Sequence, residues 1–124
     1  MSVLKADTIQ STGGGAATLT KQEANKMWVN YTGSDASVND SLNVSSTTDD
    51  ATGKDTVTFS SAMGNANYSA TMGCSRNGTT TADNQTEGFF GPTTALVKIN
   101  TMRADNQAYA DFTIVTMQIS GDLA

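Results

Sequence analysis

The stretch from Lys5 to Tyr31 constrains the fold more than any other feature of the chain. Its opening run, ADTIQSTGGGAATLT, carries too few large apolar side chains to bury itself. An isolated segment of this composition does not fold alone. A strand-like run, WVNYT, follows a few residues later. We therefore expect an extended arm, ordered by contact with neighbouring subunits, that leads into a β domain.

The composition favours an all-β surface protein. The 124 residues suit one domain plus an arm. They include 20 Thr, 12 Ser and 10 Asn, whereas only 15% are charged. Thr fits half-exposed strands, and Ser and Asn fit turns. The net charge of −5, with no basic cluster, argues against binding of nucleic acid or anionic membranes.

The residues that most often carry catalysis are scarce. The chain has no His, which removes the commonest general base and transition-metal ligand. Cys74 is the single cysteine, so a disulfide within the chain is excluded. It lies in an alternating run and is interpreted as a buried, unreactive small residue. We expect a non-enzymatic protein without a cofactor or a metal ion.

Two groups of carboxylates are candidates for a metal or catalytic site. Calcium at the first group is disfavoured, because the spacing fits no EF-hand loop and a solvated turn explains it. A glycosidase pair in the second group needs a cleft, so a charged loop rim is preferred. The first group is Asp49, Asp50 and Asp55 around Gly53, and the second is Asp83, Glu87 and Asp105.

Nothing in the sequence indicates export or membrane insertion. Residues 1–5 lack the apolar segment of a signal peptide. No run reaches the roughly eighteen apolar residues of a membrane span. We expect synthesis in a cytoplasm and no membrane insertion.

A short helix is predicted between the arm and the first strand. Thr20 and Glu23 have the spacing of a capping box. Ala24, Lys26 and Met27 would continue the helix for two turns or fewer. Such a helix must dock on other structure, and the apolar residues at its end are the expected contacts.

Alternating apolar and polar residues predict six or so strands joined by polar turns. Val38, Leu42 and Val44 would share one face of a single strand. Polar loops are expected at residues 47–55 and 76–87. The prediction is an antiparallel β-sandwich over residues 28–124, with residues 1–27 forming the arm and the one short helix. The strands are predicted at residues 28–32, 38–45, 56–60, 66–75, 95–102 and 109–119.

Most of the eight aromatic residues fall at alternating strand positions, where a core role is expected. Phe89 and Phe90 are adjacent, so in an extended segment one of the two must point outward. This pair is the best candidate for a contact surface. Burial in a subunit interface is favoured over contact with a ligand.

Three runs of the sequence resemble a known family. They are ADTIQSTGGGAATLTKQEANKMWVNY, LNVSSTTDDATGKDTVTFSSAMGNANYSATM and the terminal ISGDLA. Together they are similar to small tail-fibre-type structural proteins encoded by marine and other environmental tailed bacteriophages. The resemblance extends over most of the chain, with residues 76–107 excepted. Its motifs carry no catalytic chemistry.

The resemblance implies a homotrimeric virion component that is synthesised in the cytoplasm of a bacterial host. One interpretation is a tail fibre or spike component whose distal loops touch a host surface glycan or outer-membrane protein. The alternative is a capsid decoration or head-fibre protein anchored through its N-terminal arm. In either case the partners are its trimer mates and other virion proteins.

Two sets of residues are candidates for these contacts. Three consecutive glycines would let three backbones approach a common axis, although they fit a flexible hinge as well. The trimer or attachment set is Ile9, Gly13, Gly14, Gly15, Leu19, Met27 and Trp28. The distal surface set is Asn77, Thr80, Asn84, Phe89 and Phe90.

Overall fold

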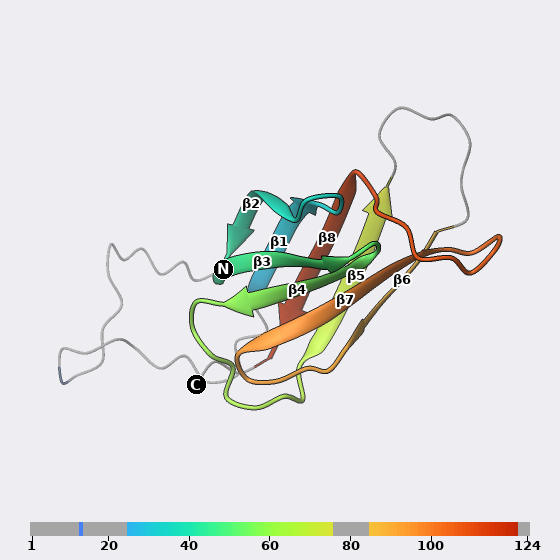
Figure 1. Cartoon of the computed structure of the whole chain (residues 1–124). Helices are drawn as coiled ribbons and strands as arrows, with labels where there is room; N and C mark the ends of the chain where they lie inside the picture. Colours follow the sequence, from blue (N-terminus) through green and yellow to red (C-terminus); the bar gives the residue numbers. More distant parts are fainter. Residues whose placement is uncertain (1–12, 14–24, 76–84, 122–124) are drawn as a thin grey trace, which may run out of the picture.

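The structure is a computed structural model that describes Gly13 and residues 25–75 and 85–121. These residues form eight strands in two antiparallel sheets of four strands (Figure 1). The strand orders are β2-β1-β8-β5 and β3-β4-β7-β6. The strands are β1 (Asn25–Thr32), β2 (Ser37–Leu42), β3 (Val44–Ala51), β4 (Lys54–Phe59), β5 (Ser69–Ser75), β6 (Gln85–Phe90), β7 (Leu96–Arg103) and β8 (Ile114–Ser120).

Three strands show why this sequence forms two layers. In β1, β4 and β8, buried side chains alternate with exposed or half-buried ones. Successive side chains of a strand point to opposite faces, so each of these strands has one apolar face. The apolar faces of both sheets meet in one core. Its buried members are Met27, Val29, Tyr31, Val57, Phe59, Met63, Tyr68, Val97, Ile99, Phe112, Val115, Met117 and Ile119.

The chain passes from the first sheet to the second at Asn43. This residue has a φ of 58°, in the left-handed region that Asn tolerates better than most residues. Its side-chain Nδ2 donates to the carbonyls of Lys26 and Ser61, both at 3.1 Å. Its Oδ1 accepts from the backbone N–H of Ser61 at 2.7 Å. Asn43 therefore fixes the junction between β2 and β3.

Four predicted elements are wrong. The loop predicted over 47–55 is reduced to a turn at residues 52–53, because β3 extends to Ala51 and β4 begins at Lys54. The expected helix does not extend to Met27, because residues 25–27 already belong to β1, and Met27 pairs with Ile119 of β8. Residues 38–45 are not one strand, because the chain changes sheets at Asn43. The loop predicted over 76–87 is shorter at its end, since β6 begins at Gln85.

Other strand predictions hold with shifted bounds. The structure has eight strands where about six were expected, because residues 47–51 and 85–90 are also strands. The predicted strand from Tyr109 begins only at Ile114, and Tyr109 makes an isolated bridge to Met102. The start of β1 adds three residues to the β domain that the prediction placed in the arm. Thr20 and Glu23 lie outside the described residues.

Candidate functional site

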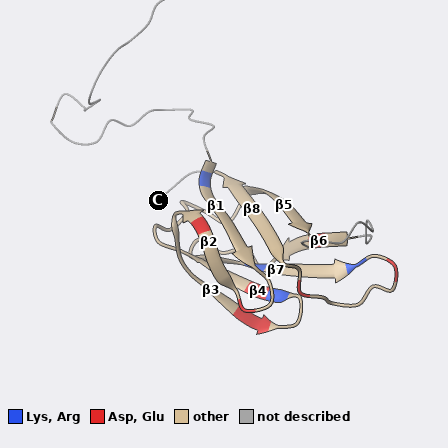
Figure 2. Cartoon of the chain, turned by 90° about the horizontal axis from the view of Figure 1, so that it is seen from above, with Lys and Arg blue, Asp and Glu red and all other residues tan. Residues whose placement is uncertain are grey.

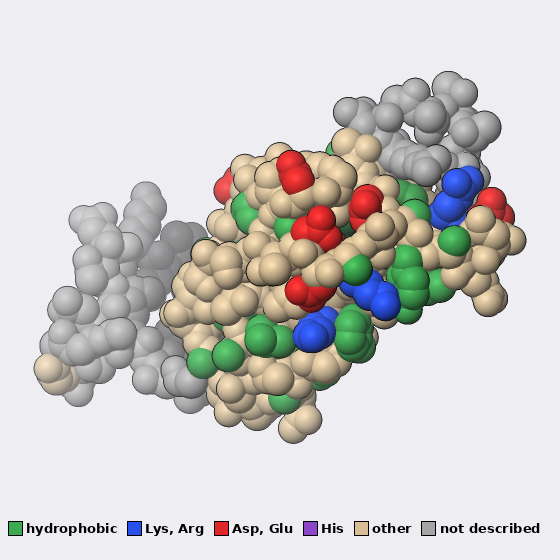
Figure 3. Space-filling model, in the orientation of Figure 1, with side chains coloured by type: hydrophobic (Ala, Val, Ile, Leu, Met, Phe, Trp, Pro, Cys, Tyr) green, Lys and Arg blue, Asp and Glu red, His purple; other side chains and the backbone are tan. Residues whose placement is uncertain are grey.

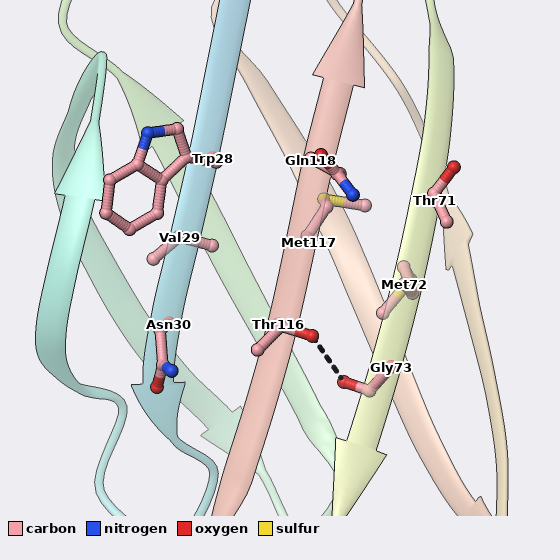
Figure 4. Close-up of a pocket in the computed structure, with 9 residues that line it drawn as sticks. All are labelled: Trp28, Val29, Asn30, Thr71, Met72, Gly73, Thr116, Met117 and Gln118. Carbon is pink, nitrogen blue, oxygen red and sulfur yellow. Dashed lines mark hydrogen bonds between the residues drawn. The ribbon is translucent and has the colours of Figure 1, made fainter. Parts of the chain in front are cut away.

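The outer face of the β2-β1-β8-β5 sheet has a hollow over three of its four strands, β1, β8 and β5 (Figure 4). The hollow has a volume of about 330 Å³, which is at the lower end of the range for small-molecule sites. Nine residues line it: Trp28, Val29, Asn30, Thr71, Met72, Gly73, Thr116, Met117 and Gln118.

Strand register places two rows of side chains across this face. Directly paired residues of antiparallel strands share a face, and the intervening residues Val29 and Met117 point into the core. The rows therefore point outward. The first row is Trp28, Gln118 and Thr71, and the second is Asn30, Thr116 and Gly73.

Hydrogen bonds orient the polar groups of the hollow. The Oε1 atom of Gln118 accepts from Nδ2 of Asn25 at 2.7 Å. The Oδ1 atom of Asn30 accepts from Nδ2 of Asn39 at 3.0 Å. Both bonds use the amide oxygens, which leaves the NH₂ groups of Gln118 and Asn30 as donors toward solvent.

The floor of the hollow is open because Gly73 has no side chain. Thr116 Oγ1 donates to the carbonyl of Gly73 at 3.2 Å, which is the contact drawn in Figure 4. A Cβ at Gly73 would lie 3.2 Å from that hydroxyl. A larger side chain here would crowd Thr116.

The hollow is free of charge along two of its strands. Neither β5 nor β8 contains a charged residue, and both strands are tan throughout in Figure 2. The acidic group nearest in register is Asp40, which pairs with Asn30 across β1 and β2. The face of the other sheet differs, since Figure 3 shows red and blue side chains among green ones there.

A buried carboxyl lies between the two sheets, away from the hollow. Asp55 is 1% exposed, and its Oδ2 accepts a hydrogen bond from the Tyr31 hydroxyl at 2.9 Å. Its Oδ1 has no hydrogen-bond partner among the residues that the structure describes. Burial, opposed by the Tyr31 bond and reinforced by Asp49, Asp111 and Asp50, raises the pKa of Asp55 to about 6. Burial, with Asp55 second, also raises the pKa of Tyr31 far above its ordinary range.

Asp55 pairs with Asp49 across β3 and β4, but of the three acidic residues grouped in the sequence only Asp55 is buried. Asp49 and Asp50 are exposed on β3, and Asp50 accepts a hydrogen bond from Thr56 Oγ1 at 2.6 Å. Within residues 25–75 and 85–121, no group of three or more His, Cys, Asp or Glu side chains is arranged to hold a metal ion.

Cys74 is half-buried and packs against the core from β5. Its thiol lies 3.5 Å from a Glu87 carboxylate oxygen. Burial, and then the negative charge of Glu87, raise the pKa of Cys74 to about 12. A thiol with so high a pKa is a poor nucleophile at neutral pH, which agrees with the interpretation from the sequence.

The two predicted sets of contact residues are only partly visible. Met27 is completely buried in the domain's own core, so it is not available for attachment, and the prediction for it is wrong. Trp28 is on the outer face, in the hollow. Gly13 is exposed. The other members lie outside the described residues: Ile9, Gly14, Gly15, Leu19, Asn77, Thr80 and Asn84.

Phe89 and Phe90 lie on opposite faces of the edge strand β6. Phe89 pairs with the buried Ile99, whereas Phe90 pairs with the exposed Lys98. Both rings remain about 40% exposed, at 40% and 42%. One ring points outward as expected, and the other is exposed because β6 is at the rim of its sheet. They lie on the sheet opposite Trp28, so the structure does not bring the two candidate regions together.

Sequence reasoning missed most of the hollow. Asn30, Thr71, Thr116 and Gln118 are common polar residues at the outward positions of strands, where solvent exposure alone explains them. Their signal is the alternation itself, which shows that they share a face with Trp28 once the strand order is known. The pairing of β1 with β8, and of β8 with β5, provides that order.

Comparison with known protein families, curated proteins and solved structures finds no match to this chain. Among the residues that the structure describes, no helix is long and apolar enough to cross a membrane.

Proposed function

We propose that the chain is a non-enzymatic structural protein of a tailed-bacteriophage virion, a tail fibre or spike component that contacts the host surface. In this proposal the two sheets form a β-sandwich, three copies associate, and the N-terminal arm attaches them to other virion proteins. The resemblance of the three sequence runs to tail-fibre-type proteins supports the virion assignment.

The observation that carries the binding role is the uncharged hollow on the β2-β1-β8-β5 sheet. Its polar groups project from three paired strands, which hold them more rigidly than loops would. The groups with strongly shifted pKa values lie in the core or against it, and none of them lines the hollow. Tyr31 and Asp55 are buried in the core, and Cys74 is half-buried beside Glu87. This arrangement suits recognition at a surface better than acid–base chemistry.

The virion assignment is tested by locating the protein on phage particles. Electron microscopy with a gold-labelled antibody against residues 25–121 should place the label at the tail. Label over the head would overturn the tail assignment in favour of a capsid decoration or head-fibre protein. Absence of label from purified particles, with the protein present in the lysate, would overturn both.

The role of the arm is tested by deletion of residues 1–17. These residues precede β1, and the described core is formed by residues from Met27 onward. We expect the shortened protein to fold, with an unchanged melting temperature, and to be missing from assembled virions. Normal incorporation of the shortened protein would contradict the attachment role.

The distal surface is tested by replacing residues 77–84 with a Gly-Ser linker of equal length. The replacement ends before Gln85, so β6 is retained. We expect normal assembly and reduced adsorption to the host. Normal adsorption would show that this segment does not present the receptor contact.

A further inference from the structure

We propose that the β2–β3 rim of one copy docks on the β5–β6 rim of the next copy, so that three copies close into a ring. Each rim is named after its two edge strands, one from each sheet, and the two rims lie on opposite sides of the molecule (Figure 1). This interface deepens the proposed function and rests on it for the number of copies. A ring of three requires two different surfaces of the chain to meet at each contact.

The β5–β6 rim has a hollow between the two sheets, with a volume of about 340 Å³. Ala70 and Met72 of β5 line it and also pack against the core. Phe89 of β6 lines the other side; it pairs with the buried Ile99 and yet remains 40% exposed. Inward-facing apolar side chains therefore reach solvent at this rim. Such a surface suits an apolar side chain from a neighbouring copy.

The β2–β3 rim carries an apolar side chain that can fill such a hollow. Leu42 of β2 is exposed and pairs directly with Trp28 of β1. Figure 4 shows the indole ring of Trp28 over the gap between β1 and β2, on the side of β1 away from Gln118. Trp28 and Leu42 therefore form one apolar patch that continues to the edge of the sheet. Aromatic residues are enriched at the centres of protein interfaces.

The apolar patch on the β2–β3 rim lies between one basic and one acidic residue. Lys26 shares the outer face of β1 with Trp28, two residues further along the chain. Asp40 precedes Leu42 by two residues on β2 and is exposed. Along this rim the order is therefore a cation, the apolar patch and a carboxylate.

The β5–β6 rim has the same arrangement with the charges reversed. Glu87 is half-buried in the hollow, two residues before Phe89 on β6. Lys98 is exposed and pairs with Phe90 at the other end of that strand. The order is a carboxylate, the apolar hollow and a cation. Opposite charges facing each other fix the register of two docked surfaces.

The aligned rims bring two pairs of opposite charges together. Lys26 of one copy then faces Glu87 of the next, and Asp40 faces Lys98. Leu42 lies between these pairs and enters the hollow. The interface thus has an apolar centre with charged residues at its border, as protein interfaces commonly do.

A contact between two β2–β3 rims is disfavoured by charge. The strands β2 and β3 contain no cation, and Figure 2 shows red segments on both of them. Two such rims would repel each other, whereas the β5–β6 rim offers Lys98. Arg103 of β7 is already paired with Asp105 at 3.6 Å. The acidic residues of β2 and β3 are Asp40, Asp49 and Asp50.

Cross-linking tests which surfaces meet. In the full chain carrying Cys74→Ser, we would introduce Leu42→Cys and Phe89→Cys together and add a short bis-maleimide. Each copy in the ring offers one thiol to each neighbour, so denaturing gels should show covalent dimers and trimers. Variants with only one of the two new cysteines should remain single chains. Dimers from a single-cysteine variant, or no cross-links in the double-cysteine variant, would overturn the proposal.

An exchange of charges tests the same contact without a new thiol. Asp40→Lys and Lys98→Asp each reverse one exposed charge. Each alone places like charges across the interface, so we expect association about tenfold weaker in sedimentation experiments. The two together restore an opposite pair and should associate as the native chain does.

The matched control combines Asp40→Lys with Lys54→Asp. It keeps the native net charge of −5, as the exchange variant does. Lys54 lies over the Tyr109 ring, 4.3 Å from its centroid, and has no place in the proposed contact. The control should therefore stay about tenfold weaker than the native chain. An exchange variant that associates no more tightly than this control would overturn the proposal.

These results are separate from the virion test. A trimer without the cross-link between positions 42 and 89 would retain the proposed function and remove this interface. Cross-linked trimers with no label on phage particles would retain the interface and remove the virion assignment.

Discussion

Asp55 shows how one buried carboxyl affects the whole domain. It is enclosed between the sheets and accepts a hydrogen bond from the Tyr31 hydroxyl. Its pKa of about 6 lies above its ordinary value of 3.8. The folded state therefore binds this proton more tightly than the unfolded state does. The contribution of Asp55 to stability is greatest below about pH 4 and is lost as the pH rises through 6.

We expect Asp55→Asn to remove this pH dependence. Between pH 8 and pH 4.5, the free energy of unfolding of the native chain should increase relative to that of the variant by about 2 kcal/mol. Urea denaturation at both pH values measures the difference. Tyr31→Phe serves as a comparison, because losing the hydrogen bond should move the pKa of Asp55 higher. A constant difference between the native chain and Asp55→Asn across this range would contradict the prediction.

Asn43 combines a left-handed backbone with three side-chain hydrogen bonds at the junction between the sheets. Two substitutions separate these contributions. Asn43→Gly keeps the backbone conformation accessible and loses the bonds, and should cost about 2 kcal/mol. Asn43→Ala should cost about 1 kcal/mol more, since Ala also resists a positive φ. Equal stability of the two variants in thermal denaturation would show that the backbone conformation contributes nothing.

At the scale of elements, the β3–β4 hairpin depends on Gly53. Its φ is +64°, and its N–H donates to Asp111 Oδ1 at 2.6 Å. A Cβ here would clash with the carbonyl of Thr101 and lie 2.7 Å from the N atom of Ala110. The close approach ties the hairpin to β7 and to the chain that leads into β8.

We expect Gly53→Ala to reduce the free energy of unfolding by at least about 2 kcal/mol, because both the backbone and the neighbouring atoms resist the methyl group. Gly88→Ala is the matched control. Gly88 lies in β6, and no atom of the described part of the chain lies within 4 Å of its ideal Cβ position, so its substitution should change stability by less than about 0.5 kcal/mol. Chemical denaturation of both variants tests the contrast, which would fail if the two costs were similar.

At the scale of the whole molecule, an edge strand of each sheet exposes apolar side chains. On β2, Val38 and Leu42 are 42% and 48% exposed, and Phe89 and Phe90 are exposed on β6. Exposed apolar residues at sheet edges often belong to interfaces between subunits. They are consistent with the homotrimer that the arm and the sequence resemblance imply.

We expect light scattering coupled to size-exclusion chromatography to give three times the chain mass of 12.9 kDa. Phe90→Glu should shift the mass toward that of a monomer, because a charge at a subunit interface is costly to bury. Thr94→Glu, at an exposed loop position outside the strands, should leave the mass unchanged. A monomer mass for the native chain at micromolar concentration would contradict the trimer.

Local patterns were sufficient for the strands with one clear apolar face. Val57 and Phe59 alternate with threonines, and β4 forms there with both residues buried. A strand was likewise predicted at residues 66–75, and in β5 Ala70, Met72 and Cys74 pack against the core. The helix prediction failed at Met27 because pairing with Ile119 and complete burial outweigh a weak local helix signal.

The sequence by itself determined an all-β chain, the inward faces of its clearest strands and the scarcity of catalytic residue types. Each of these follows from the chemistry of neighbouring residues. Only the tertiary structure decided that the chain changes sheets at Asn43, that Asp55 is buried against Tyr31, and that Trp28 shares a hollow with Gln118 and Thr71. These features depend on which distant strands pair, and the free energy of that pairing is a property of the assembled sheets.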